Sequence, residues 1–170
     1  MMSPLSHRRG RAGRGHHAGV ALLAPPRFTC GWPIIERGED IRMTDDINPR
    51  GALTVRISAM PADTNANGDI FGGWVMSCMD QAGGIAGVER ARGRVATIAV
   101  DAMKFIRPVR VGDVLEVYTE VESIGRTSMK IHVEAWARRF QTAIHEKVTD
   151  ANFTFVAIDD NGRPRPVPNV

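Results

Sequence analysis

Cysteine is scarce in this chain of 170 residues, which has only Cys30 and Cys78. Two cysteines cannot build the disulfide framework of a small secreted protein, and they favour a reducing compartment, so we expect a cytoplasmic protein. No apolar run approaches the roughly 20 residues that a transmembrane helix needs, so we expect no membrane partner. Hydrophobic residues make up 43% and charged residues 24%, which is the composition of an ordinary globular protein.

The basic charge of the chain is confined to its first segment. The formal net charge is +3, but residues 1–42 carry +4 and the remainder carries −1. Residues 1–31 are rich in Arg, Gly, Pro and His and show no sustained helical or strand period, which predicts a disordered extension over residues 1–42. We expect no nucleic-acid partner, because no aromatic side chains alternate with these arginines to stack on bases.

A targeting signal explains this extension less well than disorder does. The apolar stretch of residues 20–24 is shorter than the roughly 7–15 residues of a signal peptide and runs into Pro25. A transit peptide would be richer in serine. Met43, followed by Thr-Asp-Asp, is a sensible start of translation, which would make residues 1–42 an extension translated from an upstream codon.

Proline is absent between residues 62 and 107, and the pattern there predicts one long helix over about residues 71–91. Asp69 stands just before it and is a candidate cap. The helix is rich in glycine and alanine and is apolar nearly all round, which favours a buried helix enclosed by a curved sheet.

The remainder of the chain alternates as strands do. Strands are expected at residues 53–58, 95–100, 114–121, 129–134 and 148–158. We expect short turns to join the last four, which predicts an antiparallel sheet with the helix covering one face. The predicted fold class is therefore α+β.

Asp80 is the only charged side chain between Phe71 and Val88. Gly73 lies seven positions before it, on nearly the same face of the helix. At the start of the helix, the free N–H groups of Gly72 and Gly73 can hold a developing oxyanion. A carboxylate beside such a site is a hydrolase arrangement, although a carboxylate that caps a turn or pairs with an arginine fits equally well.

Other chemistries have weaker support. Ser77 or Cys78 as a nucleophile needs a histidine base, and His132 falls in a predicted strand while His145 falls in a predicted loop. Cys78 is therefore expected to be a small buried hydrophobic residue. No cluster of cysteine and histidine predicts a metal site.

A long motif carries a resemblance to a known family. Residues 65–74 read Asn-Ala-Asn-Gly-Asp-Ile-Phe-Gly-Gly-Trp, and residues 76–80 read Met-Ser-Cys-Met-Asp. On these motifs, and on further ones at residues 103–109, 111–114, 125–128 and 148–157, residues 50–168 resemble the acyl-CoA thioesterases of the hot-dog fold, most of all the short single-domain bacterial YciA-type enzymes.

This resemblance implies a fold and an assembly. It implies a five-stranded antiparallel sheet wrapped around one long central helix. Two such units would pair into a homodimer with a ten-stranded sheet and active sites at the interface, and the dimers would assemble further into a hexamer as a trimer of dimers. The activity implied is hydrolysis of acyl-CoA to CoA and a free carboxylic acid, with no metal or redox cofactor.

The resemblance also implies roles for named residues. Asp80 matches the catalytic carboxylate, a general base or a nucleophile, and Asn65 of the partner subunit would position the water or the thioester. The N–H of Gly73, with that of Gly72, would bind the carbonyl oxygen. The expected CoA contacts are Arg107 and the turn formed by Gly125, Arg126, Thr127 and Ser128, whose cations and donors suit phosphates.

Two rival functions remain open at this point. A hot-dog hydratase or dehydratase usually needs a histidine near the helix, and none occurs between His17 and His132. A non-catalytic acyl-CoA-binding regulator is the other rival, and no helix-turn-helix pattern precedes the domain to support it.

Overall fold

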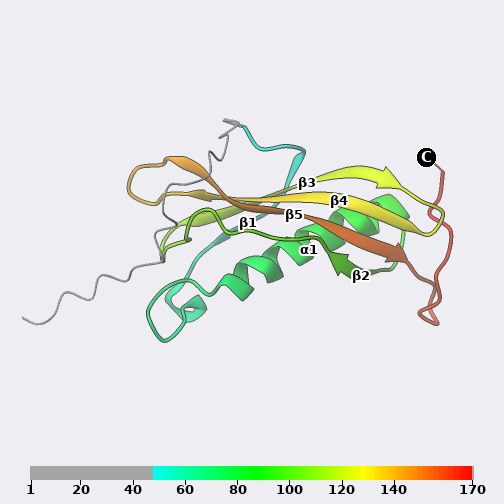
Figure 1. Ribbon diagram of the computed structural model, residues 1–170, viewed down its shortest axis with the longest axis horizontal. Coiled ribbons are helices and arrows are strands. Elements are labelled where there is room, and N and C mark those ends of the chain that lie inside the picture. The colour runs from blue at the N-terminus through cyan, green and yellow to red at the C-terminus, as the bar shows by residue number, and fades with distance from the viewer. Residues whose placement is uncertain (1–47, 170) are drawn as a thin grey trace, which may run out of the picture. The chain divides into compact units, whose positions relative to one another are not determined.

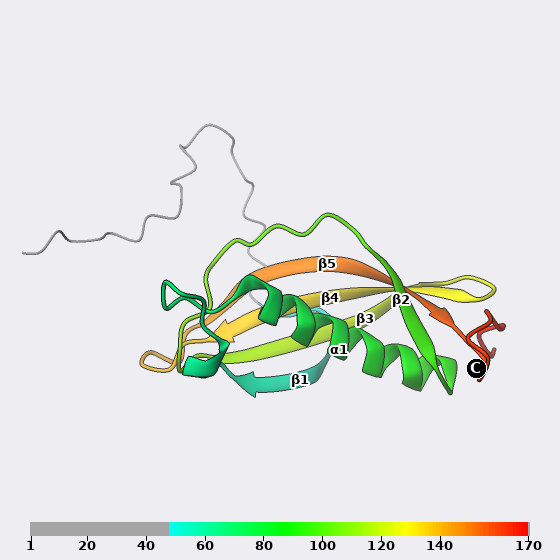
Figure 2. The same cartoon turned by 90° about the horizontal axis from the view of Figure 1, so that it is seen from below.

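The computed structural model describes residues 48–169, so the extension predicted over residues 1–42 and the start at Met43 lie outside the described residues. Its elements are β1 (Ala52–Ser58), the short 3-10 helix η1 (Pro61–Asp63), α1 (Gly72–Ala91), β2 (Val95–Val100), β3 (Val114–Ile124), β4 (Ser128–Arg138) and β5 (His145–Ala157). The strands form one antiparallel five-stranded sheet in the order β1-β3-β4-β5-β2. Helix α1 lies along one face of this sheet (Figures 1 and 2), which confirms the predicted fold class.

The connection between β2 and β3 differs from the prediction. Strand β2 pairs with β5 at one edge of the sheet, whereas β3 lies beside β1 near the other edge. Residues 101–113 join them as a long connection and not as a short turn. It runs beside β5, where the N–H of Ile106 donates to the carbonyl of Val148 at 2.7 Å. Strand β5 also begins earlier than predicted, so His145 is its first residue and not part of a loop.

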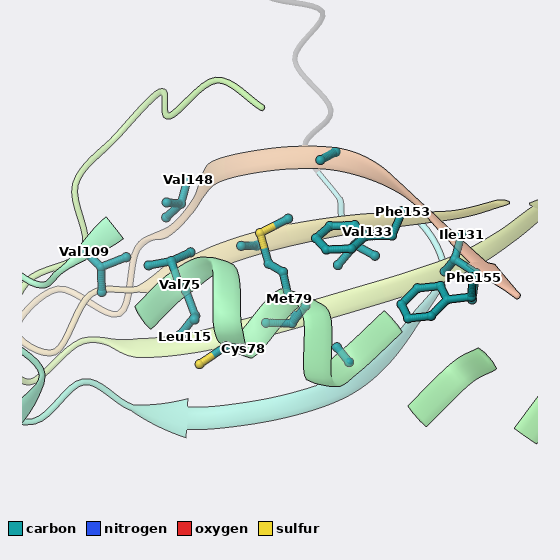
Figure 3. Packing of buried hydrophobic residues seen from close by; sticks show 14 of the residues in the cluster. Val75, Cys78, Met79, Val109, Leu115, Ile131, Val133, Val148, Phe153 and Phe155 are labelled. Atoms are coloured by element: carbon teal, nitrogen blue, oxygen red, sulfur yellow. The ribbon is translucent and has the colours of Figure 1, made fainter. Parts of the chain in front are cut away.

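The core lies between α1 and the face of the sheet that α1 covers. Side chains alternate along each strand, so every second residue of β3, β4 and β5 points toward the helix. Its buried members include Val75 and Met79 of α1, Leu115 of β3, Ile131 and Val133 of β4, and Phe153 and Phe155 of β5 (Figure 3). This layer fixes the rotation of α1 about its axis, and thereby the direction in which its remaining face points.

Gly83 lets the helix approach the sheet closely. A Cβ atom at this position would lie 2.8 Å from the ring of Phe155, closer than real contacts allow. The neighbouring Gly84 is different, since a Cβ there would meet nothing within 4 Å. The glycines of α1 therefore serve two faces, one packed against the sheet and one open.

The open face of α1 is apolar. Ile85 is 44% exposed and Val88 is 46% exposed, so the expectation of a helix buried on nearly all sides is wrong for the single chain. Met76 is 44% exposed as well, but it lies nine residues before Ile85 and therefore on the opposite side of the helix. The adjacent edge strand β2 exposes Ile98 and Val100 as well. Ile85, Val88, Ile98 and Val100 are called the open strip below. An exposed apolar surface of this kind marks an interaction or ligand site.

Two carboxylates are buried on the opposite face of the sheet. Glu116 of β3 and Glu134 of β4 are each 0% exposed. The guanidinium of Arg138 holds Glu116 with two bonds of 3.1 Å, and Lys147 Nζ lies 3.1 Å from Glu134. Buried charges persist in proteins when they are paired in this way.

Candidate functional site

Asp80 lies on the open face of α1 and is held by the neighbouring strand. The hydroxyl of Thr97 in β2 donates a hydrogen bond of 2.7 Å to Asp80 Oδ1. The register of β2 against β5 shifts between Thr97 and Ala99, and such bulges re-aim side chains. Within residues 48–169 the other oxygen, Oδ2, has no hydrogen-bond partner, so it is the one able to accept a proton.

Thr97 is a site residue that the sequence analysis missed. It belongs to an alternating strand and looks like an ordinary surface threonine there. Its contact with Asp80 depends on the placement of β2 at the sheet edge beside α1, which no local sequence pattern reports. The only feature of the sequence that could have pointed to Thr97 was its hydroxyl group in the strand that follows the helix.

The N-terminus of α1 carries no side-chain cap. Phe71 occupies the N-cap position, so the expectation that Asp69 caps the helix is wrong. The first internal bond at this end runs from the N–H of Trp74 to the carbonyl of Phe71 at 2.9 Å. The N–H groups of Gly72 and Gly73 precede it and have no acceptor within the helix. They are the donors that an oxyanion or another anion requires.

Asp80 and Gly73 lie on one face of α1, as the sequence spacing predicts, but they are two turns apart. Seven residues of an α-helix span about 10 Å along its axis. One carbonyl group cannot reach the Gly73 N–H while a water held by Asp80 of the same chain attacks it. A site that uses both groups therefore needs two chains.

Asn65 lies in the tight turn before α1. Its Oδ1 accepts hydrogen bonds from the N–H groups of Asn67 at 2.9 Å and Asp69 at 3.2 Å. The backbone N–H of Asn65 also donates to the carbonyl of Asp69 at 2.8 Å. Because the oxygen is used twice, the exposed carboxamide acts through its NH2 group, which can only donate. This donor suits the oxygen of a substrate carbonyl.

The expected CoA contacts lie near opposite ends of helix α1. Arg107 belongs to the long connection near the N-terminus of α1, where the ring of Phe105 lies 3.6 Å from a Cβ placed on Gly72. The turn of residues 125–128 lies near the other end, since the N–H of Val167 donates to the carbonyl of Arg126 and Arg165 binds Ala91. A 20-residue helix spans about 30 Å. One chain therefore does not bring these groups together.

The two arginines also differ in their surroundings. Arg107 donates to the carbonyl of Lys147 at 3.2 Å, and its Nε lies 3.7 Å from a carboxylate oxygen of Glu146. The side chain of Arg126 is exposed and forms no ion pair with another described residue. Arg126 is therefore the better placed of the two to receive a phosphate.

Cys78 is not a nucleophile in this fold. It is 4% exposed and points into the core, as predicted for a small hydrophobic residue (Figure 3). Burial raises the pKa of its thiol, which disfavours the reactive thiolate. His132 and His145 lie on the other face of the sheet, where they contact Glu134 and Glu116 at 3.2 and 2.9 Å. Neither histidine is placed to act as a general base for a nucleophile on α1.

Residues 48–169 contain neither a cluster of metal-ligating side chains nor a membrane-spanning helix. No group of three or more His, Cys, Asp or Glu side chains in this range is arranged to hold a metal ion. No helix in the same range combines the length and apolar character needed to cross a membrane.

Known proteins resemble this chain over its structured part. Residues 67–142 match the family model of the Thioesterase superfamily. An "Uncharacterized acyl-CoA thioester hydrolase" of Haemophilus influenzae is 54% identical over 122 residues, which cover 70% of this chain and 79% of that protein. The acyl-CoA thioester hydrolase YciA of Salmonella typhimurium is 49% identical over 128 residues, covering 74% of this chain and 96% of YciA.

A solved structure gives the same result for the fold. The hexameric thioesterase y2039 from Yersinia pestis superposes with a TM-score of 0.70 at 49% sequence identity, covering 72% of this chain and all of that one. The chain belongs to the Thioesterase superfamily and has its hot-dog fold. Among the members of that family it is similar to the YciA proteins, as the sequence motifs predicted.

Proposed function

We propose that the protein hydrolyses acyl-CoA thioesters and releases CoA and a free carboxylic acid. The observation that carries this proposal is the carboxylate of Asp80, exposed on an apolar helix face and oriented by Thr97. A general base needs both accessibility and a fixed orientation. The names of the relatives, which are acyl-CoA thioester hydrolases, support the choice of substrate.

The reaction follows from the donors and acceptors already described. Asp80 accepts a proton from a water molecule, whose oxygen attacks the thioester carbonyl carbon. The N–H of Gly73, together with that of Gly72 and the carboxamide NH2 of Asn65, stabilises the oxyanion that forms. The C–S bond then breaks, and the thiolate of CoA leaves and takes up a proton. These steps need no metal or redox cofactor, and dialysis against a chelator should leave the rate unchanged.

We place the active site between two copies of the chain. Asp80 comes from one copy and Gly73 from the other, because the two lie about 10 Å apart along the helix of one chain. Asn65 lies in the turn before the same end of α1 and is supplied by the copy that supplies Gly73. Antiparallel packing of two α1 helices covers the open strip and aligns edge strand β2 with its copy to give a ten-stranded sheet. The Yersinia relative is a hexamer, which supports a trimer of such dimers.

The same two-fold arrangement explains the CoA contacts. In an antiparallel pair, the N-terminal end of one α1 lies beside the C-terminal end of the other. Arg107 of one subunit then approaches Gly125, Arg126, Thr127 and Ser128 of its partner. The phosphates of one CoA molecule can meet both sets of donors there.

The working unit is residues 50–168, and residues 1–42 contribute to neither activity nor assembly. A chain that begins at Met43 should therefore keep the full rate and the full oligomer mass. A lower mass or rate would assign a structural role to residues 1–42. The cytoplasmic location stays a prediction, which fractionation of the host cell would test.

A panel of acyl-CoA substrates tests the function. The wild-type protein should release free thiol from at least one member of an acetyl-, butyryl-, octanoyl- and lauroyl-CoA series. Asp80→Asn should keep the fold and oligomer mass but lose at least a hundredfold in kcat, as expected when a positioned base is removed. Binding of CoA without thiol release at any chain length would favour the regulatory function instead.

A further inference from the structure

A largely buried arginine lies just beyond the end of strand β4. The side chain of Arg139 is 12% exposed, and its Nε donates to Oε2 of Glu146 at 2.6 Å. Its other contacts are to the connection between β2 and β3, where it donates to the carbonyl of Pro108 at 2.9 Å and to Oδ2 of Asp113 at 2.5 Å. These three acceptors hold the guanidinium in place, so Arg139 cannot turn toward a ligand.

The register of the sheet brings Arg139 to Glu146. Ala137 of β4 pairs with Glu146 of β5, and Arg139 lies two positions after Ala137. Residues two apart in an extended chain point to the same face, so the side chains of Arg139 and Glu146 share one face of the sheet. Diagonal neighbours of this kind are within reach of long side chains. The contact therefore follows from the pairing of β4 with β5.

Glu146 lies between two arginines, and only one of them binds it closely. Its Oε2 accepts from Arg139, whereas its Oε1 lies 3.7 Å from Nε of Arg107, which is longer than a hydrogen bond. Arg107 is oriented instead by the carbonyl of Lys147, to which its Nη1 donates at 3.2 Å. The side chain of Arg107 is 35% exposed, and within residues 48–169 its Nη2 has no hydrogen-bond partner. Arg107 is therefore held in place with donors to spare.

We propose that Arg139 is a positioning residue for CoA binding, because it holds Glu146 away from Arg107 and leaves the Arg107 guanidinium free for a phosphate of CoA. The proposal rests on the proposed function and adds a residue that touches neither the substrate nor the reacting atoms. Without Arg139, the carboxylate of Glu146 would turn to Arg107 and close a charge-assisted hydrogen bond. A guanidinium paired in this way offers a phosphate fewer donors and less net charge.

Binding of CoA to the full-length protein, measured by calorimetry, tests this role. Arg139→Met should raise the Kd for CoA about tenfold, the low end of what a hydrogen bond to a charged group contributes. The kcat/KM for butyryl-pantetheine, a thioester without phosphates, should stay near the wild-type value. Arg138→Met is the matched control, since Arg138 binds Glu116 on the opposite face of the sheet and its loss should leave the Kd unchanged.

A substitution of Glu146 separates positioning from a structural role. Arg139→Met combined with Glu146→Gln removes the carboxylate that would close on Arg107, so this double variant should bind CoA about as tightly as the wild type. It lacks the same contacts to Asp113 and Pro108 as Arg139→Met alone, so a structural role predicts no such recovery.

Glu146→Gln alone decides the question if Arg139→Met does not fold, because this variant keeps the contacts of Arg139 to Asp113 and Pro108. It should bind CoA about two- to threefold more tightly than the wild type, since one negative charge near the phosphate is gone. Unchanged or weaker binding by Glu146→Gln would overturn the proposal.

The other contradicting results concern Arg139→Met. An unchanged Kd for CoA, an equal loss toward CoA and butyryl-pantetheine, or no recovery in the double variant would overturn the proposal. Absence of CoA binding by the wild type would overturn it as well. Failure of the proposed function is distinct, since the wild type would then bind CoA but release no thiol from any acyl-CoA.

Discussion

Thr97 Oγ1 donates to Asp80 Oδ1 at 2.7 Å and joins the edge strand β2 to the exposed face of α1. The bond leaves a rotatable carboxylate in one orientation, with Oδ2 free to accept a proton. Thr97 touches no reacting atom in this scheme and is therefore a positioning residue. Its position at a register shift of β2 explains why a side chain of an edge strand reaches the helix.

Replacement of Thr97 should lower the rate without unfolding the protein. A hydrogen bond to a charged group contributes about 1.5–3 kcal/mol, so Thr97→Ala should lower kcat by about ten- to a hundredfold. KM should change little, because the carboxylate acts on the water and not on CoA. Thr97→Ser keeps the hydroxyl and should recover most of kcat. Equal rates for the alanine and serine variants would contradict the positioning role.

The two adjacent glycines of α1 should respond oppositely to alanine. Gly83→Ala places a methyl group 2.8 Å from the ring of Phe155, and overpacking of this kind costs about 1–3 kcal/mol. Gly84→Ala meets nothing and gains helix propensity of up to about 1 kcal/mol. Thermal unfolding should therefore show a lower Tm for Gly83→Ala and an equal or higher Tm for Gly84→Ala. Equal losses at both positions would mean that α1 does not pack as described.

Glu134 should make stability fall in acid. Burial alone raises the pKa of Glu134, but hydrogen bonds from His132, Trp136, Lys147 and the N–H of Arg50 outweigh it and lower the pKa from 4.5 to about 2. A carboxyl whose pKa is lower in the folded state stabilises the fold above its unfolded value. That stabilisation, about 3 kcal/mol, is lost as the pH falls from 4.5 toward 2.

Denaturant unfolding at several pH values checks this prediction. The free energy of unfolding of the wild type should drop between pH 4.5 and 2. Glu134→Gln should be less stable at pH 7, since the half-buried Lys147 and the buried His132 lose their counter-charge. Its stability should change less than that of the wild type over the acid range. A parallel drop in both proteins would assign the acid sensitivity to other carboxylates.

The sequence predicted the elements better than their arrangement. Alternation and the proline-free stretch identified every strand and the long helix, because local periodicity reports which face of an element is buried. The position of β2 beside β5 was not predicted, since the residues of an edge strand do not show which strand it pairs with. For the same reason the contact between Thr97 and Asp80, which joins two elements, was missed.

The candidate site was likewise predicted only in part from the sequence. The motif identified Asp80, Asn65 and Gly73 as the residues to consider, and the structure supplies their accessibility and hydrogen bonds. The distance between Asp80 and Gly73 along the helix could be derived from spacing alone. The assignment of these residues to two subunits needs one more step. That distance has to be compared with the size of one thioester group.

Subunit mixing tests the central claim, a site built from two copies, most directly. Asp80→Asn and Asn65→Ala homo-oligomers should each be nearly inactive in thiol release from butyryl-CoA. When the two variants are coexpressed, random pairing makes half of the dimers mixed, and each mixed dimer contains one intact site and one doubly altered site. The account predicts recovery of about a quarter of the wild-type rate per subunit. No recovery above the two parent variants, in oligomers shown to be mixed, would contradict it.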